Sequence, residues 1–149
     1  MIPKISRGSD PAGLVKYLFG KGRHNEHANQ HLVACSDDLL DSFGFDGHPD
    51  ESYAKIGERF DRRYRVRERK GDPFPRDRRG RHNPGGEHGK DRVWHCSLSI
   101  KAGQGILTDG QWEAIVRDYL KRMSILPDDG AAGVTWLAVR HGLATTMCT

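Results

Sequence analysis

The sequence predicts one small α/β or α+β domain in which helices cover a single sheet. A chain of 149 residues suits one domain with a modest core. Several segments carry apolar residues at helical spacing, and others are short apolar runs typical of strands. In the second half, a strand, a helix and a strand follow one another between Val93 and Val139. Such a crossover unit predicts two parallel strands.

The first elements are short. Residues Ile2–Ile5 can form an opening strand, and the sequence Ser9-Asp10-Pro11 is a typical helix start, because Ser9 or Asp10 can cap the helix and Pro11 suits its first turn. The helix that comes next carries three side chains at i, i+3 and i+4 and is ended by two glycines: Leu14, Tyr17 and Leu18, then Gly20 and Gly22.

A candidate buried strand, His31–Cys35, comes after this helix. A second helix is expected to begin near Pro49 or Asp50, with an apolar stripe at spacings of three and four formed by Tyr53, Ile56, Phe60 and Tyr64. After Lys70 the turn signals multiply and apolar residues are scarce. We therefore expect residues 71–91 to be an exposed, mobile loop.

The second half gives clearer signals. Val93–Ile100 is expected to be a strand, and Thr108 with Gln111 matches a capping box. The helix after it has an extended apolar face made of Trp112, Ile115, Val116, Tyr119, Leu120 and Met123. A buried strand is then expected over Val134–Val139, running into Arg140-His141.

Composition narrows the class of protein. The formal charge is +4 and the sequence pI is about 9.1, which favours an anionic partner such as nucleic acid. The three cysteines, Cys35, Cys96 and Cys148, form no CxxC pair, so neither a disulfide framework nor a zinc knuckle is indicated. No apolar segment resembles a signal peptide or a membrane span. The sequence thus predicts a cytoplasmic protein.

Tyr17 is a candidate nucleophile. A tyrosine hydroxyl can attack a phosphodiester and hold the DNA end covalently, but its ordinary pKa of about 10 means that it needs a neighbouring metal or base. The alternative is that Tyr17 packs with Leu14 and Leu18 on the helix face.

His141 directly follows a buried strand, where sheet proteins often place their chemistry, and neutral imidazole is a common metal ligand. One histidine cannot hold a metal by itself, and no His-x-His partner is present in the remaining residues. The alternative is a surface histidine at a strand end.

Basic residues are concentrated between Arg59 and Arg81. This stretch has eleven Lys or Arg against four acids, and its local charge exceeds that of the whole chain. Tyr64 and Phe74 lie within it and can stack on bases. Such concentration is typical of phosphate binding, although a solvated helix face with a polar loop is the alternative.

Taken in order, these pieces resemble the relaxase, or mobilisation nuclease, family of conjugative plasmids, especially its actinobacterial members. Residues 1–8 and the segment Gly13–Leu18 are similar to the family's first motif, and Val93–Ser99 is similar to its second. The helix from Thr108 to Met123 and the strand Trp136–Gly142 resemble the helix and strand that come after the second motif in the family. The similarity extends from Met1 to about Leu143.

The resemblance implies a small sheet of the HUH endonuclease type and a tyrosine transesterase that nicks and transfers single-stranded DNA at a transfer origin. It implies Tyr17 as the nucleophile, His141 as a ligand of Mg²⁺ or Mn²⁺, and accessory relaxosome proteins as partners. The implied DNA contacts are Ser99, Arg62, Arg63, Arg65, Arg67, Arg69 and Lys70.

The family's third motif places a His-x-His pair on the next strand, and residues 143–149 contain no histidine. We therefore expect two metal ligands and their strand to be absent, leaving an unpaired sheet edge and impaired nicking. A frameshift, a premature stop or a truncation after Leu143 would explain this. The alternatives are a non-catalytic DNA-binding fragment that uses residues 59–81, and a decayed reading frame whose product does not fold stably.

Overall fold

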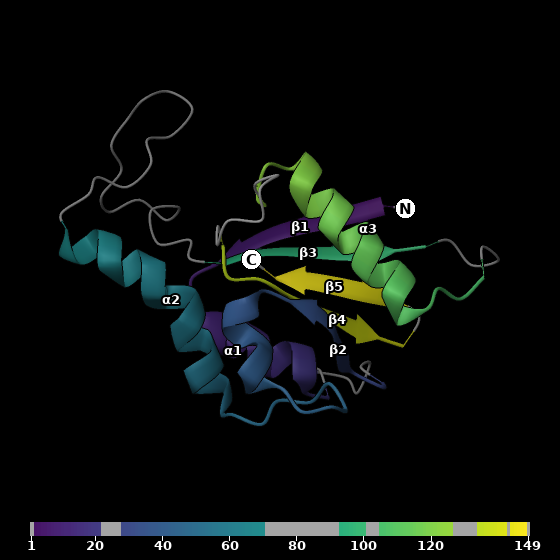
Figure 1. Cartoon of the computed structure of the whole chain (residues 1–149), viewed down its shortest axis with the longest axis horizontal. Helices are drawn as coiled ribbons and strands as arrows, with labels where there is room; N and C mark the ends of the chain where they lie inside the picture. Colours follow the sequence, from purple (N-terminus) through teal and green to yellow (C-terminus); the bar gives the residue numbers. More distant parts are fainter. Residues whose placement is uncertain are drawn as a thin grey trace.

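The structure is a computed structural model that describes residues 2–21, 28–70, 93–100, 105–126 and 134–142, together with the backbone of the strand at 144–148 (Figure 1). The elements are, in chain order, β1 (Ile2–Gly8), α1 (Pro11–Phe19), β2 (His31–Cys35), the 3₁₀ helix η1 (Asp37–Ser42), α2 (Tyr53–Arg69), β3 (Val93–Ser99), α3 (Asp109–Arg122), β4 (Leu137–His141) and β5 (Ala144–Cys148).

The described strands form one sheet in the order β1-β3-β5-β4-β2, and every neighbouring pair is antiparallel. The fold is therefore α+β. The predicted crossover with parallel strands is confirmed: β3 and β4 run in the same direction, because each is antiparallel to β5, which separates them in the sheet. Figure 1 shows β5 lying between them.

The expectation that the sheet lacks a strand after His141 is wrong. Residues Ala144–Cys148 form β5, which pairs with β3 on one side and with β4 on the other. A tight turn at Gly142, with φ of 53°, joins β4 to β5. The sheet edge that was expected to be unpaired is consequently filled, although the strand carries no histidine.

Helix α3 covers one face of the sheet, as predicted. Thr108 caps it: the backbone N–H of Gln111 donates to Oγ1 of Thr108 at 3.3 Å, and the backbone N–H of Thr108 donates to Oε1 of Gln111 at 2.9 Å. The buried side of the helix and the sheet share a core of Ala34, Cys96, Leu98, Trp112, Val116, Leu120, Trp136 and Ala138.

Helices α1 and α2 pack on the second core, on the opposite face. Asp10 caps α1 by accepting a hydrogen bond from the backbone N–H of Gly13 at 2.9 Å. The two helices approach closely at Gly57, where an added Cβ would lie 2.7 Å from Ala12. This core contains Val15, Leu18, Cys35, Leu39, Ile56, Phe60, Val93, Leu137 and Val139.

The predicted elements are present with shifted boundaries. The second helix begins at Tyr53 rather than near Pro49, and the last predicted strand begins at Leu137 rather than at Val134. The 3₁₀ helix η1 and the strand β5 had no counterpart in the prediction. The expected loop at 71–91 lies outside the described residues. In the described part of the chain, no helix is long and apolar enough to cross a membrane.

Candidate nucleic-acid site

Tyr17 lies in the last turn of α1, and its side chain is 43% exposed. The buried face of this helix is formed by Pro11, Val15 and Leu18 instead. Tyr17 therefore lies outside the fully buried face of α1. A side chain with this exposure can be reached by a ligand, which a nucleophile for DNA requires.

His141 and Ser99 lie in the same cross-strand row of the sheet, which means that both are opposite Ala144 of β5. His141 is the cross-strand partner of Ala144, and Leu98 is the partner of Thr145. One step further along this register, Ser99 comes opposite Ala144. Two strand spacings then separate Ser99 from His141, which is about 10 Å between backbones. The strand β5, which the sequence analysis did not anticipate, sets this relationship.

The last turn of α1 and the end of β4 are tied to the same short segment. The Gln30 side chain donates to the carbonyl oxygen of Gly20 at 2.6 Å, directly after α1. The backbone N–H of Gly142 donates to the carbonyl oxygen of Ala28 at 2.8 Å. Residues 28–30 thus bring the part of α1 that carries Tyr17 toward the strand end that carries His141.

The residues around His141 do not fit a catalytic Mg²⁺ or Mn²⁺ ion. Its row contains Ser99 and Ala144, of which only the serine offers an oxygen, and a stable site needs several carboxylate or imidazole ligands. Among the described residues, no group of three His, Cys, Asp or Glu side chains could hold a metal. No catalytic step through a metal is therefore derived for this chain.

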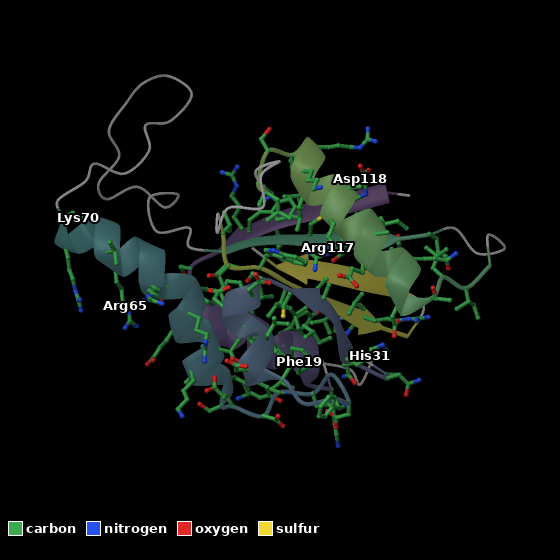
Figure 2. All side chains as sticks on the ribbon, in the orientation of Figure 1. Phe19, His31, Arg65, Lys70, Arg117 and Asp118 are labelled. Atoms are coloured by element: carbon green, nitrogen blue, oxygen red, sulfur yellow. The ribbon has the colours of Figure 1, made fainter. Side chains whose placement is uncertain are left out.

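The basic residues occupy the C-terminal half of α2. Four of them have exposed side chains: Arg62, Arg65, Arg69 and Lys70. Arg62, Arg65 and Arg69 recur at spacings of three and four, so they share one helix face. Figure 2 shows Arg65 and Lys70 pointing away from the body of the protein. The side chains of Arg63 and Arg67 lie outside the described part of the structure.

The structure does not bring all the predicted residues together. In Figure 1 the basic end of α2 extends beyond one end of the sheet, whereas β4 runs toward the other end, where His141 lies. Tyr17, Ser99 and His141 belong to that other half. A bound strand would therefore have to cross the sheet to contact both groups.

A charged cluster at the end of β4 was missed by the sequence analysis. Asp109, in the first turn of α3, accepts from Arg140 Nη1 at 2.6 Å and contacts His31 Nε2 at 3.1 Å. Burial alone raises the pKa of Asp109, but the hydrogen bonds from Arg140 and His31 outweigh it and hold this pKa below its ordinary value. Arg140 also donates to the carbonyl oxygen of Gly142 at 3.1 Å, which fixes the turn after His141.

The buried thiols of Cys35 and Cys96 are poor nucleophiles, and the imidazole of His95 is held in its neutral form. His95 contacts Ser6 Oγ through Nδ1 at 3.2 Å, and desolvation lowers its pKa, which favours neutral imidazole. Burial raises the pKa of Cys96, and burial followed by the charge of Asp38 raises that of Cys35 to about 11. Both thiols therefore stay protonated near neutral pH.

Comparison with known proteins gives no independent indication of function, since no family model, no curated protein and no solved structure matches this chain.

Proposed function

We propose that this chain is a relaxase-type domain that handles single-stranded DNA, with Tyr17 as the residue that would attack the phosphodiester. The observation that carries the proposal is the half-exposed Tyr17 in the last turn of α1, tied through residues 28–30 to the strand end at His141. Ser99, in the same row of the sheet as His141, is a candidate DNA contact.

The same geometry limits the proposed activity. A tyrosine hydroxyl needs a base or a cation to become a nucleophile, and a developing charge on the phosphate needs stabilisation. His141 offers one imidazole for these tasks. Nicking by these 149 residues is therefore expected to be weak or absent, while binding of DNA is retained.

A labelled single-stranded oligonucleotide carrying a transfer origin, incubated with Mg²⁺ or Mn²⁺, tests this expectation. We expect binding but little or no covalent adduct on denaturing gels, with no difference between the native chain and Tyr17→Phe. An abundant adduct that disappears in Tyr17→Phe would contradict the expected impairment and would establish Tyr17 as the nucleophile.

The second candidate function is DNA binding without chemistry, and the exposed face of Arg62, Arg65 and Arg69 favours it. Three exposed cations on one helix face can neutralise phosphates without requiring Tyr17 or His141. This function predicts salt-sensitive binding that is unchanged by Tyr17→Phe and lost when the arginines are neutralised.

A further inference from the structure

The C-terminal half of α2 presents a helix face that is both basic and apolar. We call Arg62, Arg65, Val66, Arg69 and Lys70 the basic helix end; all five side chains are exposed. Val66 is a large hydrophobic side chain left 44% accessible among these cations. Arg65 is 3.9 Å from Asp61, at the limit of an ion pair, and Arg62, Arg69 and Lys70 form no ion pair within the described part of the chain. This face is therefore available for a partner.

The complementary surface lies on η1 and the loop after it. We call Asp37, Leu40, Asp41, Phe45 and Asp46 the acidic ridge; all five are exposed, and Phe45 is completely so. From residue 37 to residue 51 the chain has six acids and no Lys or Arg. The ridge thus repels nucleic acid and combines negative charge with two exposed apolar side chains.

Arg65, Arg69 and Lys70 form no ion pair with the acidic ridge of the same molecule within the described part of the chain. Arg59 is the cation of α2 that reaches the acidic segment, where it donates to the Asp38 carbonyl oxygen at 2.6 Å and pairs with Glu51 at 3.3 Å. Arg69 lies ten residues further along the helix, which is about 15 Å at the rise of an α-helix. In Figure 2, Arg65 and Lys70 point to solvent on the part of α2 that extends away from the sheet.

We propose that the basic helix end of one copy docks on the acidic ridge of a second copy. Opposite charges would align, and Val66 would be covered by Leu40 and Phe45. The two surfaces differ, so each copy offers one of each, and the assembly is expected to grow with protein concentration. The contact uses the same arginines as the proposed DNA binding, so DNA competes with it, but it does not depend on that function.

Sedimentation velocity of the full chain tests the proposal. We expect the weight-average mass to rise with protein concentration at low ionic strength and to return to that of the monomer at about 0.5 M salt, because salt screens exposed charges. Two charge-changed variants, Arg65→Glu/Arg69→Glu and Asp37→Lys/Asp41→Lys, should each stay monomeric, since the helix end of the first is left without net charge and the ridge of the second carries a net positive charge. The control Asp118→Lys, on the outer face of α3, should associate like the native chain.

Mixing the two charge-changed variants is the decisive step. The unchanged helix end of the ridge variant then faces the unchanged acidic ridge of the helix variant, so the mixture is expected to associate again at low salt. All variants change exposed side chains and should melt like the native chain. A native chain that stays monomeric at every concentration would overturn the proposal, and so would a ridge variant that associates normally or a mixture that remains monomeric.

Discussion

Removal of residues 144–149 is expected to abolish the cooperative thermal unfolding of this protein. Strand β5 makes four residue pairs with β3 and five with β4, and it is the element that joins the two halves of the sheet (Figure 1). Without it, β1–β3 and β2–β4 remain as two-stranded ribbons, which are marginal in water. At roughly 1 kcal/mol for each lost backbone hydrogen bond, the loss approaches the whole stability of a small domain.

Circular dichroism during heating measures this effect. Two point variants distinguish the loss of strand pairing from the removal of residues 144–149. Thr146→Pro removes a backbone donor from a central strand and should also prevent folding. Thr146→Val keeps the backbone N–H and should leave the melting temperature within a few degrees of that of the native chain. A truncated chain that melts sharply near the native temperature would show that β5 does not hold the sheet together.

Reversal of the charge at Arg62, Arg65 and Arg69 is expected to remove most of the affinity for single-stranded DNA. Each phosphate contact on a single strand contributes about 0.7 to the slope of log affinity against log salt, so three lost contacts lower that slope by about 2. Replacing cations by anions adds repulsion, and we expect a loss of at least about 100-fold near 0.1 M salt. Fluorescence anisotropy with a labelled oligonucleotide measures both quantities.

A matched control separates the local effect from that of net charge. The variant Lys55→Glu/Lys121→Glu/Arg122→Glu changes the total charge by the same amount at exposed positions away from the basic helix end. We expect it to lose much less affinity than the arginine variant. Equal losses for the two triple variants would mean that DNA responds only to net charge and that α2 carries no binding surface.

Locally encoded features of the fold could be predicted from the sequence. The capping box of Thr108 and Gln111 depends on residues three apart, and the apolar face of α3 depends on a single helix period. By contrast, η1 is a short turn of acidic and apolar residues. Its apolar residues do not recur at the spacing of a helix, so no pattern predicts it. Strand β5 has the sequence ATTMC, whose strand character comes from its place between two strands rather than from its own pattern.

Much of the candidate site could not be predicted from the sequence, because its contacts join residues that lie far apart in the chain. The contact of His31 with Asp109 joins residues 78 apart, and that of Arg140 with Asp109 joins residues 31 apart. The common row of Ser99 and His141 exists because β5 lies between their strands. The sequence did single out Tyr17, but its exposure depends on which face of α1 packs on the core.

The most direct test of the proposed relaxase-type site is to place imidazoles on β5. The register pairs position 144 with His141 and position 146 with Val139, so both positions belong to the sheet face of His141. We expect Ala144→His/Thr146→His to bind Co²⁺ or Mn²⁺ at least about tenfold more tightly than the native chain and to form a DNA adduct that Tyr17→Phe abolishes. The opposite-face control, Thr145→His/Met147→His, should do neither. A folded same-face variant that gains neither metal affinity nor a Tyr17-dependent adduct would contradict the proposed site.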